Sequence, residues 1–128
     1  MSHLLRDDKL ELRPTSGSEQ FIGFGVFFDD ERVGTIVLAP APGKQGKHEG
    51  SVRWNLSDGP GKALAAKILT MVIEYAFAEL NWTRIETRID EDNTDDWRAA
   101  SLSGMRKEGI LRQPGAKSSQ MLLARVAT

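Results

Sequence analysis

A glycine-rich turn at residues 58–63 (DGPGKA) is the segment of this 128-residue sequence whose spacing best suits ligand binding. Apolar residues recur with helical periodicity directly after it, so the turn opens a helix. The first amides of a helix have no partner within the helix, and the helix dipole favours a negative charge there. Lys62 adds a cation. The turn therefore predicts a phosphate site, and the alternative is an ordinary turn leading into a surface helix.

Carboxylates and one histidine are candidates for proton transfer. His48 and Glu49 lie at the edge of a polar loop, where either could serve as a general base, although a lone loop histidine is typical of solvated surface. A second acidic group, residues 90–92 with 95–96, lacks the loop glycine and the twelfth-position glutamate of a calcium loop. It indicates a solvated turn before a helix, or a surface that attracts a cationic amine.

Composition excludes several classes of function. The net charge is −1, so binding of nucleic acid or of an anionic membrane through a basic surface is not expected, even though Trp54, Trp82 and Trp97 could stack on bases. Cysteine is absent, which removes thiolate catalysis and cysteine-based metal sites. The first residues carry charges where a signal peptide needs an apolar run, so we expect a cytoplasmic protein.

The elements that must position these residues follow from periodicity and turn signals. Strands are expected at residues 9–13, 21–28, 33–38, 51–56, 83–89, 105–111 and 120–126, with helices at 61–80 and from about 93 to 103. This order predicts one α/β domain over residues 1–128, with a mixed, mostly antiparallel sheet flanked by helices. Trp54 is expected in the core or beside a cleft, and packing is favoured for Trp97.

Residues 93–112 carry the most specific pattern. Asn93 is followed by Gly104-Met105, then by Glu108-Gly109, Leu111 and Arg112. This order resembles the N-x-x-S…G-F/M-x-x-E-G-x-L-R signature of the GNAT N-acetyltransferase superfamily, within its RimJ/RimL-like ribosomal-protein branch. With the turn at 58–63, the resemblance covers roughly residues 10–126.

The resemblance implies acetyl-CoA as cosubstrate and a primary amine, either a protein N-terminus or a small amine, as acceptor. The strands that contain Trp54 and Ile85 would separate to admit the pantetheine arm. The implied cofactor-binding residues are Leu56, Gly59, Gly61, Lys62, Ala63, Leu64, Ala65, Asn93 and Trp97. Glu49 or Glu86 would accept the amine proton, and Ser101 is a hydroxyl candidate near the thioester. No metal is implied.

The sequence departs from the family pattern at several positions. Asp58 stands at the usual Gln or Arg position of the phosphate loop, Asp96 at the serine position and Ala100 at a tyrosine position. Residues 14–21 are too few for the two helices that the family places between its first and second strands. A catalytically degenerate domain that binds CoA or a protein partner without turnover is therefore the alternative function. An apolar surface left by the missing helices would favour a homodimer.

Overall fold

The computed structural model describes residues 4–15, 21–41, 48–112, 114–115 and 117–127 of the chain. Strands dominate the N-terminal half, and the helices follow the fifth strand. In chain order the elements are β1 (Leu5–Asp7), β2 (Leu10–Pro14), β3 (Ile22–Phe28), β4 (Glu31–Pro40), β5 (Glu49–Leu56), α1 (Pro60–Ala63), α2 (Ala65–Ala78), β6 (Arg84–Asp90), α3 (Thr94–Leu102), β7 (Arg106–Leu111) and β8 (Gln120–Val126).

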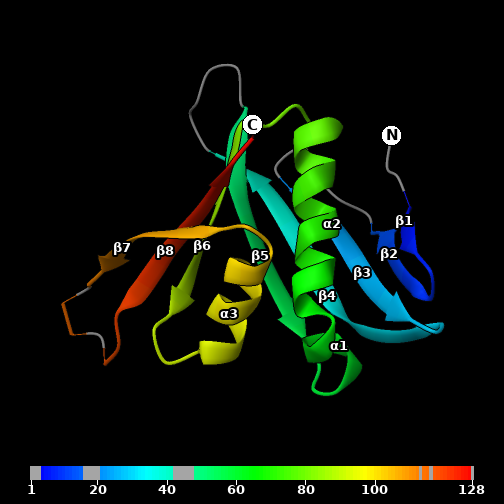
Figure 1. Cartoon of the computed structure of the whole chain (residues 1–128), viewed down its shortest axis with the longest axis horizontal. Helices are drawn as coiled ribbons and strands as arrows, with labels where there is room; N and C mark the ends of the chain where they lie inside the picture. Colours follow the sequence, from blue (N-terminus) through cyan, green and yellow to red (C-terminus); the bar gives the residue numbers. More distant parts are fainter. Residues whose placement is uncertain (1–3, 16–20, 42–47, 113, 116, 128) are drawn as a thin grey trace.

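The strands form one sheet in the order β1-β2-β3-β4-β5-β6-β8-β7 (Figure 1). Neighbouring strands are antiparallel everywhere except between β5 and β6, which run parallel. The predicted mixed, mostly antiparallel sheet is therefore confirmed. The short strand β1 lies at one edge and was not expected from the sequence.

The hairpin between β3 and β4 follows directly from its turn residues. Phe28 pairs with Glu31, which leaves Asp29 and Asp30 as a two-residue loop. Both aspartates have positive φ angles, 53° and 66°, as in the type I′ turn whose twist matches that of the flanking strands. Aspartate tolerates this conformation better than most residues, so the local sequence specifies the hairpin.

Helix α2 supplies the core on one face of the sheet. Its buried side chains, among them Ile68, Val72 and Ile73, pack against fully buried strand residues in a single apolar cluster. The helix is shorter than the predicted 61–80. Leu64 has a non-helical ψ of 6° and separates α1 from α2, and α2 ends at Ala78, shortly before Asn81 in the left-handed region at φ 57°.

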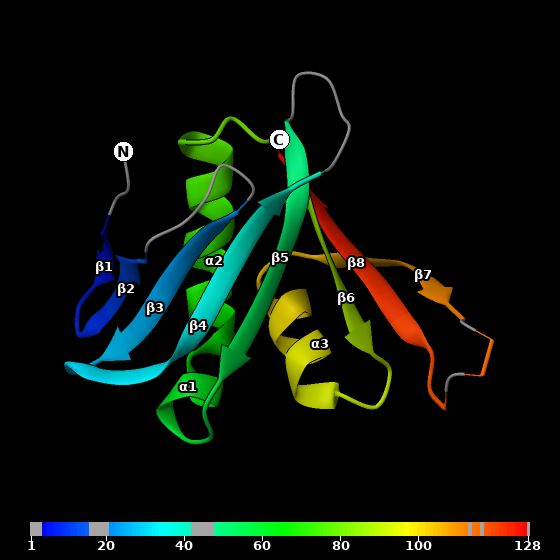
Figure 2. The ribbon, with the colours of Figure 1, turned by 180° about the vertical axis from the view of Figure 1, so that it is seen from behind.

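The connection between β2 and β3 has no room for two helices, because only residues 15–21 separate them. Seen from behind, β3, β4 and β5 lie in front of α2 without a helix over them (Figure 2). A row of Arg13, Gly25, Thr35 and Asn55 crosses the sheet on this face. The described residues of this row are polar or small, but Phe27 and Val37 lie in neighbouring rows of the same face, so the apolar surface expected here stays a prediction.

Candidate active site

The parallel strands β5 and β6 separate after a short paired stretch. Residues 49–51 pair with residues 84–86, and beyond these three pairs β5 stays with β4 while β6 stays with β8 (Figure 2). The predicted separation of the two strands is thus present. Two adjoining cavities of about 210 Å³ and 410 Å³ lie at the gap. The smaller is lined by Arg53, Trp54, Thr87, Arg88, Ile89, Asp90, Asn93, Asp96 and Gln120.

The closed end of the gap is set by tight packing. Trp82, which is 4% exposed, lies over Gly50 of β5. A Cβ at Gly50 would lie 2.4 Å from the carbonyl oxygen of Ala39 and 2.4 Å from Cη2 of Trp82. Glycine is therefore needed here for close approach of the strand to the indole, not for an unusual φ angle.

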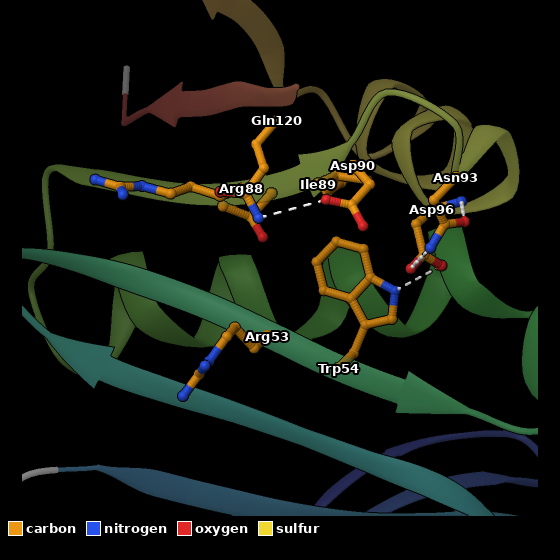
Figure 3. A pocket seen from close by; sticks show the side chains of 9 residues that line it. Arg53, Trp54, Arg88, Ile89, Asp90, Asn93, Asp96 and Gln120 are labelled. Atoms are coloured by element: carbon orange, nitrogen blue, oxygen red, sulfur yellow. Dashed lines mark hydrogen bonds between the residues drawn. The ribbon is translucent and has the colours of Figure 1, made fainter. Parts of the chain in front are cut away.

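Trp54 and Asp96 form a bridge between β5 and α3 (Figure 3). The indole Nε1 donates to Oδ1 of Asp96 at 3.2 Å, and the Asn93 amide donates to Oδ2 of Asp96 at 2.8 Å. Asn93 is also the N-cap of α3, since its Oδ1 accepts from the Asp96 N–H at 3.2 Å. The side chain of Asn93 therefore already holds the helix start, and one amide hydrogen remains for a ligand.

The glycine-rich turn lies beyond the open end of the gap, after the last residue of β5. The amides of residues 62–64 donate to carbonyl oxygens of the same turn at 2.9–3.0 Å. Among the described residues, the amides of Gly59 and Gly61 form no hydrogen bond with the protein. The row of free amides expected at residues 59–65 is therefore wrong for residues 62–64, because the turn closes on itself there.

Charges at the turn are arranged more favourably than the sequence indicated. The side chain of Asp58 is 94% exposed, so it points to solvent, and its Oδ1 lies 3.3 Å from Nζ of Lys62. The hydrogen bond to Asp58 and then its charge raise the pKa of Lys62, with smaller contributions from Asp95 and Asp96 of α3. Lys62 thus stays charged near the open end of the gap.

The three predicted catalytic residues are separated in space. Glu86 lines the larger cavity, together with Ser51, Val52, Arg53, Thr87, Arg88 and Gln120, and Arg84 Nη2 lies 3.1 Å from its Oε2. Glu49 is half-buried at the closed end of the gap and lines neither cavity. Ser101 is exposed on α3 and lines neither cavity.

The predicted cofactor-binding residues occupy three places. Leu56 and residues 59–65 lie at the open end, around the turn. Asn93 lines the smaller cavity. Trp97 is half-buried and packs against the apolar core, as the sequence favoured, and it lines neither cavity.

Sequence reasoning missed Arg53, Thr87, Arg88 and Gln120, which line both cavities. Their alternation along β5, β6 and β8 is visible in the sequence, but it gives only the sheet face of each residue. The sequence does not show which strand pairs with β5 or where that pairing ends. This decides the site, because a strand that is paired along its whole length leaves no cavity beside it.

Two further searches covered the described residues. None of their helices is long and apolar enough to cross a bilayer. No group of three or more His, Asp or Glu side chains among them is arranged to hold a metal ion.

Comparison with known proteins gives a family and a fold. The acetyltransferase (GNAT) domain family matches residues 6–106. The N-acetyltransferase p20 of Bacillus licheniformis, itself uncharacterized, is 35% identical over 52 residues, which are 41% of this chain and 29% of that protein.

Solved structures share the fold at low identity. RimJ of Mycobacterium smegmatis, determined with a CoA disulfide, has 22% identity and a TM-score of 0.72, over 84% of this chain and 54% of RimJ. A proposed acetyltransferase of Sphaerobacter thermophilus has 15% identity and a TM-score of 0.71, over 98% of this chain and 99% of that chain. This chain therefore spans about half the length of RimJ, and the predicted fold with its reduced N-terminal region is confirmed.

Proposed function

This chain belongs to the acetyltransferase (GNAT) family, and from that membership we propose that it transfers an acetyl group from acetyl-CoA to a primary amine. The observation that carries the proposal is the end of β5–β6 pairing after residues 49–51 and 84–86. Beyond it two strand edges face each other across a cavity with free main-chain groups. An extended amide-containing arm can hydrogen-bond to such an edge in the manner of an added strand.

The residues at the open end suit the diphosphate of the cosubstrate. The amides of Gly59 and Gly61 have no protein partner among the described residues, and Lys62, which pairs with Asp58, places a cation in the same turn. Asn93 retains one amide hydrogen inside the smaller cavity for a carbonyl of the arm. In this arrangement the reactive carbonyl would lie between the strands, and the cosubstrate supplies an acyl group activated as a thioester.

The chain must then remove a proton from the acceptor. The amine nitrogen has to be neutral to attack the carbonyl carbon; a C–N bond forms, the C–S bond breaks, and the thiolate takes up a proton. Glu86 is the proposed proton acceptor, because it is the one predicted base that lines a cavity. Amides on the gap edge of β5 would stabilise the developing oxyanion, and orientation alone is worth about 7–11 kcal/mol in well-placed reactants.

One observation favours a second function, binding of CoA without turnover. On α3, Asp96 is engaged by Trp54 and Asn93, and Ala100 is buried without a hydroxyl. The residues that the family resemblance assigns to thiolate protonation are thus absent from this helix. A homodimer and a cytoplasmic location remain predictions from the sequence.

Calorimetric titration with acetyl-CoA, followed by a thiol-release assay over a panel of small amines and N-terminal peptides, tests the proposal. Binding with thiol release supports acetyl transfer. Binding without release on any acceptor supports the second function, and absence of binding contradicts both.

The phosphate turn is tested by Ala63→Glu against the matched control Ala78→Glu. Ala63 is exposed in the turn, and Ala78 is exposed at the far end of α2, which is about 20 Å long at 1.5 Å per residue. We expect Ala63→Glu to weaken acetyl-CoA binding by about tenfold or more and Ala78→Glu to leave it unchanged. Gly61 is unsuitable for this test, because a Cβ there would lie 2.9 Å from the carbonyl oxygen of Val33. Equal affinities of the two variants would contradict the assignment.

A further inference from the structure

Two arginines lie on opposite sides of the gap, Arg53 on β5 and Arg88 on β6. Ser51 and Glu86 form the last β5–β6 pair, and Arg53 and Arg88 each lie two residues further along their parallel strands. Since side chains alternate along a strand, both arginines lie on the same sheet face as that last pair. Both line both cavities, and both extend away from Trp54 in the same general direction (Figure 3).

Neither arginine has a carboxylate partner among the described residues. In contrast, the nearby Arg84 pairs with Glu86 and Glu108, and its Nη2 lies 3.1 Å and 2.7 Å from their carboxylate oxygens. Two unpaired guanidinium groups at the same cavities favour an anionic ligand, and a carboxylate matches their planar donors.

Thr87 also lines the cavities. Its side chain is 3% exposed and forms no hydrogen bond with another described residue. Thr87 lies between Glu86 and Arg88 in β6, so its side chain points to the opposite sheet face, which also carries Trp54, and it does not contribute to the arginine site.

The position of the arginines separates them from the cosubstrate phosphates. The phosphate turn at residues 58–63 follows the end of β5 at Leu56, with Lys62 as its own cation. Arg53 lies three residues earlier, and its side chain extends away from Trp54, whose indole bridges to α3. The arginines thus face a second ligand rather than the diphosphate.

We propose that the acceptor amine carries a carboxylate, which Arg53 and Arg88 bind while Glu86 faces the amine. This inference rests on the proposed acetyl transfer. A free amino acid and a peptide with an acidic side chain share the required chemistry, and both put an anion within a few bonds of the reacting nitrogen. The exposed acidic residues 90–92 do not neutralise the arginines in any described contact.

The first measurement is calorimetric, so that it does not depend on turnover. Protein saturated with CoA is titrated with amino acids and with their carboxamides, and with acidic peptides and their glutamine counterparts. We expect the carboxylate compounds to bind at least tenfold more tightly than their neutral counterparts. Preference for the free amino acids or for the acidic peptides identifies the source of the carboxylate. Equal binding of each pair, or no binding of any carboxylate amine, overturns the inference.

Arg53→Gln, Arg88→Gln and the double variant then locate the carboxylate. Both residues are exposed, so we expect the variants to fold, and Arg106→Gln of β7 is the matched control because Arg106 lines neither cavity. Arg53→Gln and Arg88→Gln should each weaken binding of the carboxylate compounds about tenfold and leave the affinity for CoA unchanged. Weakened binding of CoA instead would assign the arginines to its phosphates and overturn the inference. Carboxylate binding without thiol release would support the inference and contradict acetyl transfer.

Discussion

Gly50→Ala tests whether close packing at the closed end of the gap holds β5 and β6 in position. The added Cβ would lie 2.4 Å from the Ala39 carbonyl oxygen and 2.4 Å from Trp82 Cη2. Ordinary contact begins near 3.4 Å, so the neighbours must move by about 1 Å. One of these atoms belongs to the main chain of β4, and the other belongs to a ring that is 4% exposed, so neither moves freely.

Overpacking in a well-packed region typically costs about 1–3 kcal/mol. Since two rigid groups are displaced here, we expect about 3 kcal/mol, a large part of the roughly 5–15 kcal/mol that stabilises a typical domain. At about 2.1 cal/mol/K per residue, a chain of this length has an unfolding entropy near 0.27 kcal/mol/K. The variant should therefore melt about 11 °C lower in a calorimetric scan.

Gly109→Ala in β7 is the matched control, because nothing lies within 4 Å of a Cβ at that position. It should change stability by less than about 1 kcal/mol, since the only general effect is a smaller entropy of the unfolded chain. If Gly50→Ala melted within 3 °C of the unmodified protein, Trp82 and β4 would have to be easily displaced. The account of how tight packing holds β5 and β6 at the closed end of the gap would then be wrong.

Two further predictions concern α3 and the ion pairs. Asn93→Ala should lower the stability by about 1 kcal/mol through loss of the helix cap, whereas Asn93→Ser should retain most of it; equal melting temperatures would contradict the capping role. A hydrogen bond from Arg84 holds the pKa of Glu108 in the folded protein below its usual 4.5. This pair therefore stabilises the fold above about pH 4.5, and the stabilisation is lost as the pH falls through the pKa that Glu108 has in the folded protein. Glu108→Gln should therefore flatten the pH dependence of urea unfolding below pH 4.5; a curve that stays as steep as that of the unmodified protein would exclude this contribution.

Much of the fold could be predicted because its signals are local. The turn at Asp29 and Asp30, the cap at Asn93 and the positive φ of Gly104 each act within a few residues, and the elements around them were predicted to within a few positions. Strands β3 and β4 were also expected, because β-branched and aromatic residues are concentrated in residues 21–28 and 33–38.

The details of the candidate site depended on distant contacts. Trp54 and Asp96 are 42 residues apart, and their hydrogen bond has no sequence signal. The contribution of Arg53 and Arg88 depends on where β5 and β6 stop pairing, which the two strand sequences do not indicate. The break at Leu64 was missed because the apolar periodicity continues through it.

Because β5 and β6 pair over only three residues, the sheet has two unpaired strand edges at its middle in addition to those of its outer strands. Residues Val52–Leu56 pair only with β4, and residues Thr87–Asp90 pair only with β8. The main-chain carbonyl and amide groups on their other edges therefore point into the gap between β5 and β6. Unpaired strand edges of this kind can pair with an extended chain, and the start of α3 lies beside them through the hydrogen bond between Trp54 and Asp96. In the proposed function these two edges would hold the extended, amide-containing arm of the cosubstrate along the middle of the sheet.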